Sequence, residues 1–351
     1  VGMFGTGRPR LYDPDETKAE EPVIDTTNVR GAIEYRDAYL VDNDSRFVFA
    51  FVRSAIEAGA AAANYVELLA AERVGDRWEA RLRDVDTGRE FNTAARTIVN
   101  AAGPFVDGLN QTWGLSTEHR IVYSKGIHLV VPRLTTHRHD RVLAFFDDTQ
   151  RLFYVIPMGH RSVIGTTDTR VDDPYTSVTD DDRAFLLEQI NKRLDLSDRP
   201  GGALTVDDII AERSGVRPLV VKAGRGRADL DTVDWTALSR KHAIERDDDL
   251  AVVNVFGGKL TDCLNVGEEV AAEIERLGVP LERDLHNWYG EPAAATRAEF
   301  YRQAKLMKLD RLRETPHGVH ESLTDRLWRR YGRRAFGMLE AIRADPRMGE
   351  D

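Results

Sequence analysis

Residues 253–269, VNVFGGKLTDCLNVGEE, join an apolar β-rich run to a helix-like segment through two glycines, a lysine and a threonine. This order at a strand-to-helix turn suggests a phosphate loop, but Walker A spacing requires glycine and a hydroxyl where the chain has Val253 and Leu260. A nucleoside-triphosphate loop is therefore excluded. The glycines still let a ligand approach the backbone, and a helix N-terminus attracts negative charge. A tight turn with a solvated Lys259 is equally compatible with the motif.

Strand-like and helix-like segments alternate before this turn. Residues 31–41 alternate in polarity like a strand, and Asp44 or Ser45 can cap a following helix that ends near Gly59. Residues 61–103 predict a strand, a meander with Gly-Asp and Thr-Gly turns, and a final buried strand. This succession predicts an α/β protein.

The middle of the chain is strand-rich, and the end is helical. Residues 118–172 lack helical periodicity, whereas 180–194 form an amphipathic pattern with an acidic first turn, which is typical of a helix. Strands then resume up to the Gly-Gly-Lys turn, and the helix after that turn ends near Gly278. Residues 291–345 predict two or three further helices.

Composition excludes several classes of protein. The 49 basic and 59 acidic residues give a net charge of −10, which argues against a nucleic-acid partner. The single cysteine, Cys263, excludes an internal disulfide and a multi-cysteine zinc site, and fits a reducing compartment. No apolar run approaches the roughly 20 residues of a membrane span. The sequence contains no HExxH, G-x-S-x-G, G-x-G-x-x-G or His/Cys ligand spacing, so we expect no metal site.

Four polar residues are candidates for a site. Arg217, on a predicted glycine turn between two strand-like runs, and Arg240 are suited to bidentate phosphate or carboxylate binding, although either could be a surface ion-pair partner. Lys125 and His128 begin a predicted strand in the motif SKGIH. Histidine suits proton abstraction near neutral pH, but a lone histidine on a strand is commonly structural.

Two segments of small residues leave alternatives open. NAAGPFVD, residues 100–107, permits close approach of a dinucleotide at a strand end, or packing against a helix. GTTDT, residues 165–169, can line a pocket or build a turn. These patterns predict an α/β protein with one anion-binding pocket, and leave its reaction open.

Taken together, seven segments resemble FAD-dependent glycerol-3-phosphate dehydrogenase, in the family order and with similar gaps. The resemblance covers about residues 30–280 and is weaker in the C-terminal helices. The segments are AIEYRDAYLVDNDSR, NAAGPFVD, SKGIHLVVP, VIPMGHRSVIGTTDT, SGVRPLV, LSRKHAIE and FGGKLTD.

The resemblance implies the fold of D-amino-acid-oxidase-like flavoproteins. In this α/β (α+β) fold, an incomplete Rossmann-like FAD-binding domain accompanies an antiparallel substrate-binding sheet and a C-terminal helical region. The implied divisions are a surface segment at 1–30, part of the FAD-binding domain at 31–117, the substrate-binding domain at 118–250, a return to the FAD-binding domain at 251–282, and part of the helical domain at 291–351.

The same resemblance assigns roles to individual residues. It implies His128 and Lys259 as catalytic residues and Arg217, Arg240 and Lys125 as substrate-binding residues. The implied cofactor contacts are Val66, Ala102, Gly103, Gly257, Gly258, Lys259, Leu260 and Thr261.

The implied reaction is oxidation of sn-glycerol 3-phosphate to dihydroxyacetone phosphate, with hydride transfer from C2 to N5 of FAD. A quinone is the expected electron acceptor, and the expected location is cytoplasmic, peripheral on the inner face of the cell membrane. The oligomeric state is open, with a homodimer among the alternatives.

The sequence departs from the family in two places. Asp262, Cys263 and Leu264 replace the family's threonine-tyrosine-arginine, and about 100 residues that would carry the N-terminal glycine fingerprint are lacking. We therefore expect a fragment of a longer dehydrogenase that alone binds FAD poorly or not at all and is inactive. The alternatives are a related FAD-dependent oxidase of another hydroxy or amino acid, and a non-catalytic remnant.

Overall fold

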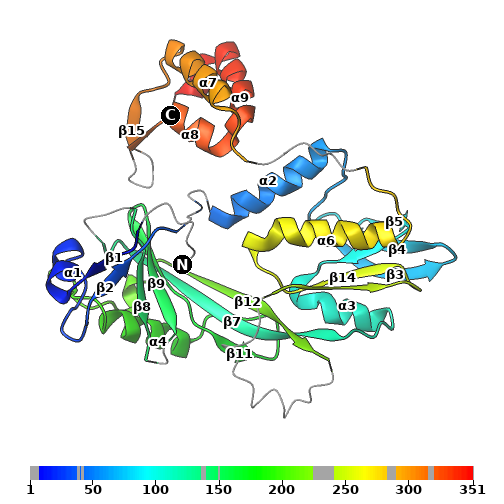
Figure 1. The fold of residues 1–351 in the computed structure, drawn as a ribbon, viewed down its shortest axis with the longest axis horizontal. Coiled ribbons are helices and arrows are strands. Elements are labelled where there is room, and N and C mark those ends of the chain that lie inside the picture. Colours follow the sequence, from blue (N-terminus) through cyan, green and yellow to red (C-terminus); the bar gives the residue numbers. More distant parts are fainter. Residues whose placement is uncertain are drawn as a thin grey trace.

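The computed structural model describes residues 8–37, 40, 43–135, 140–148, 151–223, 241–282, 290–314 and 320–350. Its largest sheet has six strands in the order β11-β7-β10-β9-β8, with β12 also paired to β7 (Figure 1). These strands are β7 (His119–Pro132), β8 (Leu143–Phe146), β9 (Leu152–Met158), β10 (Arg161–Gly165), β11 (Thr169–Val171) and β12 (Ala211–Lys222).

Helix α4 (Asp180–Asn191) covers one face of this sheet. Alternate apolar residues of β7, such as Ile127 and Leu129, pack with Leu186 and Ile190 of α4 in the main core. Thr179 begins the helix through a capping box with Asp182 at its N3 position. The acidic first turn predicted from the sequence thus forms the capped start of this helix.

A second, smaller sheet follows the order β13-β14-β6, where β14 is antiparallel to β13 and parallel to β6. Helices α3 and α6 lie on opposite sides of β14 (Figure 1), and every residue of β14 is buried, as expected for a strand covered on both faces. These elements are β6 (Ile98–Asn100), α3 (Val106–Thr112), β13 (Ala243–Asp247), β14 (Val252–Phe256) and α6 (Cys263–Arg276).

An antiparallel meander and a helical region complete the chain. Trp78 joins the meander to the smaller sheet by donating from Nε1 to the Leu250 carbonyl at 2.7 Å. The meander comprises β3 (Val66–Val74), β4 (Arg77–Asp84) and β5 (Glu90–Ala95). The helical region comprises α7 (Ala294–Leu306), β15 (Leu312–Glu314), β16 (His320–Ser322), α8 (Leu323–Tyr331) and α9 (Ala335–Ala344).

Helix α2 (Asn43–Glu57) contacts the helical region through polar groups. Arg46 donates to the Arg330 carbonyl at 3.0 Å, and Arg334 pairs with Glu57. No side chain of α2 is buried, although the helix is amphipathic. Its exposed apolar residues include Val48, Phe49, Val52 and Ile56.

The α/β class predicted from the sequence is confirmed, and three local expectations change. Asn43, rather than Asp44 or Ser45, accepts the Arg46 N–H at the start of α2, whereas Gly59 ends it with φ of 96° as predicted.

The second change concerns the first 30 residues, which we expected to be a surface segment. Residues 8–30 include β1 (Arg10–Tyr12), which pairs with β2 (Ala32–Glu34), and α1 (Pro14–Glu20). They also contribute Ile24 to the main core.

The third change concerns the glycine turn expected at residues 214–219. Strand β12 runs through this segment without a break. Its described partner is β7 alone, so Pro218 needs no second ladder partner for the N–H that it lacks. The chain has left this sheet by Ala243, where β13 joins β14, so the change of sheet precedes the predicted boundary at 250.

Within the described ranges, every helix is too short or too polar to span a bilayer.

Candidate active site

Strand β7 has two chemically different faces. Side chains alternate along a strand, so Lys125 shares the face of Ile127 and Leu129, which pack against α4. There the Lys125 Nζ lies 2.6 Å from Oδ2 of Asp182, and each side chain is only 8% exposed. His128 belongs to the opposite face. The structure therefore separates Lys125 from His128, although the sequence predicted both at one site.

Arg217 lies on the His128 face of the sheet. It pairs in register with Ser124 of β7, and directly opposed residues share a face. Its guanidinium lies over Gly126, where a Cβ atom would come 2.7 Å from the Arg217 Cζ. The glycine of the SKGIH motif thus makes room for the arginine. The Arg217 side chain remains 28% exposed.

The GTTDT segment orients this arginine. Arg217 Nη2 donates to Oγ1 of Thr166 at 2.8 Å, and Nη1 donates to the carbonyl of Thr167 at 3.2 Å. Asp168 lies 3.7 Å from Arg217 Nη1 and also accepts a hydrogen bond from the Ser124 hydroxyl. The segment thus contacts Arg217, and its role as the lining of a ligand pocket stays a prediction.

His128 is half-buried beside two arginines. It pairs in register with Gly165 of β10 and with Arg213 of β12. Burial lowers the pKa of the His128 imidazole, and the positive charges of Arg217 and Arg213 lower it further. The ring is therefore held in its neutral form, which can accept a proton.

The Gly-Gly-Lys turn adjoins the strand that carries Arg217. Gly257 and Gly258 have φ of 62° and 106°, a region that favours glycine. A Cβ on Gly257 would overlap the Val220 side chain of β12, so the turn packs closely against this strand. The exposed Lys259 precedes a 3₁₀ turn that leads into α6.

The small-residue segment after β6 reaches the same edge. Because β6 runs parallel to β14, Ala102 and Gly103 leave the sheet on the side where Gly257 does. Tyr123 of β7 donates to the Pro104 carbonyl at 3.0 Å, which joins this segment to the large sheet. Ala102, Gly103 and the lysine turn therefore face the junction of the two sheets.

The remaining predicted contacts are placed differently. Leu260 and Thr261 follow Lys259 in the exposed 3₁₀ turn. Val66 begins β3 in the meander, a different sheet from the one that carries the turn. Arg240 lies outside the described residues.

The lysine turn fits the flavin end of FAD. Its two glycines leave the backbone open to a flat ring, and the following helix N-terminus and Lys259 favour negative charge there. The sequence contains no G-x-G-x-x-G fingerprint for a pyrophosphate. The residues present therefore account for one end of the cofactor.

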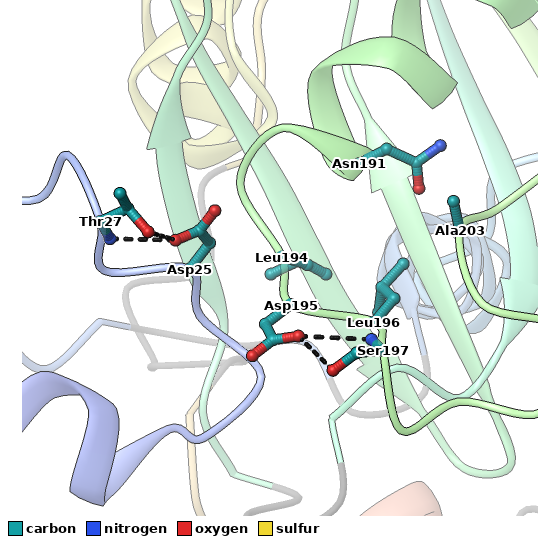
Figure 2. Close-up of a pocket in the computed structure, with 8 residues that line it drawn as sticks. All are labelled: Asp25, Thr27, Asn191, Leu194, Asp195, Leu196, Ser197 and Ala203. Atoms are coloured by element: carbon teal, nitrogen blue, oxygen red, sulfur yellow. Dashed lines mark hydrogen bonds between the residues drawn. The ribbon is translucent and has the colours of Figure 1, made fainter.

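A pocket of about 380 Å³ lies between the N-terminal segment and the loop after α4 (Figure 2). Its carboxylates bond locally: Asp25 accepts from Thr27, and Asp195 accepts from Ser197 and Lys18. It shares no lining residue with the Arg217 site. Among the described residues, no cluster of His, Cys, Asp and Glu side chains could hold a metal ion.

Sequence reasoning missed three residues that shape this region. Gly126 accommodates Arg217, Asp182 neutralises Lys125, and Asp168 contacts Arg217. Strand periodicity could have assigned Lys125 to the α4 face, since residues three apart on a strand point in opposite directions. The other contacts join distant segments and have no local signal.

The family model for FAD dependent oxidoreductase (DAO) matches residues 3–272. The mitochondrial glycerol-3-phosphate dehydrogenase of Rattus norvegicus is 29% identical over 269 residues, which cover 73% of this chain and 34% of that protein. The aerobic glycerol-3-phosphate dehydrogenase of Bacillus subtilis (strain 168) is 28% identical over 296 residues, 81% of this chain and 49% of that protein. The glycerol-3-phosphate dehydrogenase of Pseudomonas tolaasii is 27% identical over 329 residues, 92% of this chain and 60% of that protein.

A solved structure shares the fold. The glycerol-3-phosphate dehydrogenase from Bacillus halodurans, complexed with FAD, superposes with a TM-score of 0.69 at 23% identity, covering 97% of this chain and 66% of that chain. The present chain thus spans about a third to two thirds of the length of these proteins.

Proposed function

The chain belongs to the family of FAD-dependent oxidoreductases, and we propose that it acts in the oxidation of sn-glycerol 3-phosphate to dihydroxyacetone phosphate. The observation that carries this proposal is the fixed guanidinium of Arg217 on the same sheet face as a neutral His128. Relatives named glycerol-3-phosphate dehydrogenase support the choice of substrate.

Arg217 is proposed to bind the substrate phosphate. Its contacts with Thr166 and Thr167 fix the guanidinium plane, and a fixed fork suits bidentate phosphate recognition. Such positioning reduces the entropy that must be lost on the way to the transition state. We assign Arg240 the same role on the resemblance alone.

His128 and Lys259 are proposed to act at the reacting carbon. The neutral imidazole of His128 can take the proton of the C2 hydroxyl. Bound FAD would accept the hydride from C2. Lys259, with the helix N-terminus behind it, provides positive charge at the flavin face. We assign Lys125 a structural role, because its ammonium is paired with Asp182 inside the core.

The acceptor of the electrons is proposed to be a quinone at the inner face of the cell membrane. This part of the proposal rests on the resemblance alone. Faster reoxidation of the reduced flavin by a soluble quinone analogue than by dissolved oxygen would support a quinone acceptor. The reverse order of rates would favour an oxidase.

The first test is flavin absorbance of the purified full-length protein, together with its reduction of a dye by glycerol 3-phosphate. We expect bound flavin and reduction that requires the phosphate group. Absence of both in the full-length protein would refute the proposal. Reduction by an amino acid or an unphosphorylated hydroxy acid instead would favour the related oxidase.

A second test removes the phosphate contact. We expect Arg217→Ala to raise KM for glycerol 3-phosphate about 30- to 100-fold, because a charge-assisted bidentate interaction is lost. Lys222→Ala, at the far end of the same strand and exposed, is the matched control and should leave KM nearly unchanged. An unchanged KM in Arg217→Ala would remove this residue from phosphate binding.

A further inference from the structure

His242 lies between two carboxylates at the turn that carries Lys259. Its Nδ1 is 2.8 Å from Oδ2 of Asp262, and its Nε2 is 3.1 Å from Oε2 of Glu269. Asp262 ends the 3₁₀ turn after Lys259, Glu269 lies in the middle of α6, and His242 directly precedes β13. One imidazole thus joins the turn, the helix and the strand.

The geometry favours the charged form of His242. A neutral imidazole has a single N–H and can donate to only one carboxylate, whereas the imidazolium donates from both nitrogens. Burial lowers the pKa of His242, but hydrogen bonds and charge from Glu269 and Asp262 outweigh this effect and raise the pKa above its usual value. Hydrogen bonds from Asn265 and His242 lower the pKa of Asp262, and among the described residues the charge of Lys259 lowers it further.

Backbone contacts transmit the position of His242 to the lysine turn. The Asp262 N–H donates to the carbonyl of Lys259 at 2.9 Å, so a fixed Asp262 fixes the turn. Asn265 also donates to Asp262, at 2.6 Å. A Cβ on Gly258 would lie 3.4 Å from the His242 Cβ, so the turn also rests directly against the histidine.

We propose that His242 is a positioning residue for Lys259. The protonated ring of His242 fastens the lysine turn and α6 to β13. The inference rests on the proposed role of Lys259 at the flavin. The histidine has a raised pKa in the folded chain. Its contribution to the turn is therefore complete below the unfolded pKa of about 6.5 and is lost as the pH rises through the folded value.

The first test is an NMR titration of the nine histidine rings in labelled, flavin-free chain. Loss of a signal in His242→Gln identifies the ring. We expect it to titrate above an ordinary histidine, and its pKa to fall in Asp262→Asn and in Glu269→Gln. A pKa at or below the ordinary value, or one that neither variant lowers, would overturn the proposal.

The second test is hydrogen exchange of residues 258–265, corrected for intrinsic rates. We expect about tenfold less protection at pH 9 than at pH 6 in the unaltered chain, as for the loss of a charge-assisted hydrogen bond. His242→Gln should show the low protection at both pH values. His119→Gln is the matched control, because His119 contacts one carboxylate, Glu245, at 2.7 Å and lies on β7.

Equal exchange at the two pH values, or an equal effect in the control, would overturn the positioning role. Neither measurement uses flavin or substrate. The inference can therefore fail while dye reduction by glycerol 3-phosphate succeeds, and the two failures are distinguishable.

Discussion

Replacing Lys125 with methionine would leave the carboxylate of Asp182 buried without its cation. Removal of one member of a buried ion pair typically costs about 3–5 kcal/mol. Asp182 keeps two other donors, the N–H and hydroxyl of Thr179, each at 2.9 Å. We therefore expect Lys125→Met to lower the free energy of unfolding at pH 7 by about 3 kcal/mol, the lower end of that range.

The cost of this substitution should depend on pH in a defined direction. Burial acts to raise the pKa of Asp182, but hydrogen bonds from Lys125 and Thr179 outweigh it, and the pKa is lowered. In the unaltered chain the carboxylate thus contributes stability above its unfolded pKa, and this contribution is lost as the pH falls through the folded value. Without Lys125 we expect burial to raise the pKa. The variant then takes up a proton at a higher pH than the unaltered chain does, and its deficit in stability shrinks as the pH falls.

Urea unfolding at pH 7 and pH 5 measures both effects. Lys192→Met is the matched control, since Lys192 pairs at the surface with Asp148 and Glu188 and should matter little. The double variant Lys125→Met/Asp182→Asn should recover about 2 kcal/mol, because no buried charge remains and the amide oxygen can still accept from the Thr179 N–H. A Lys125→Met variant no less stable than the control, or a deficit that is equal at both pH values, would refute the reasoning.

Two further predictions concern the Arg217 face. Gly126→Ala should raise KM for glycerol 3-phosphate at least about tenfold, because the new methyl group displaces the Arg217 guanidinium. Gly215→Ala is the control, since Gly215 lies directly opposite on β12 with open space at its Cβ, and it should not raise KM. Equal KM values in the two variants would contradict the steric account. Since positive charge helps to lower the pKa of His128, Arg213→Gln should move the acid limb of kcat/KM to higher pH, and an unmoved limb would exclude His128 as the group observed.

Local patterns predicted the elements better than they predicted the site. Helices α4 and α6 follow from amphipathic spacing and from their end signals, which act within a few residues. The glycine turn expected around Arg217 was wrong, because Gly215 lies within a continuous ladder opposite Gly126. A glycine can end a strand or allow a close approach across it, and only the partner strand distinguishes these alternatives.

The separation of Lys125 from His128 has the same cause. Sequence proximity suggested one site for both, but each side of β7 meets a different partner: α4 on one face and Arg217 on the other. The lysine turn differs from the family's sequence pattern at Asp262, and this difference also has a structural counterpart. The Asp262 carboxylate accepts a hydrogen bond from His242, which lies twenty residues earlier in the chain. Such pairings depend on which strands become neighbours, and no local pattern contains that information.

Two close contacts at glycines bear on the relative position of the proposed phosphate-binding and flavin-facing groups. Gly126 lets Arg217 lie flat on β7, and Gly257 lets the lysine turn press against Val220, three residues further along the strand that carries this arginine. A side chain at either glycine would push one group away from the other. The separation of Arg217 from Lys259 therefore depends on close packing at these two glycines, because a packed interior transmits small shifts. A hydride donor must be held to within a fraction of an ångström. That requirement explains why glycines, rather than the charged residues alone, are needed at these two places.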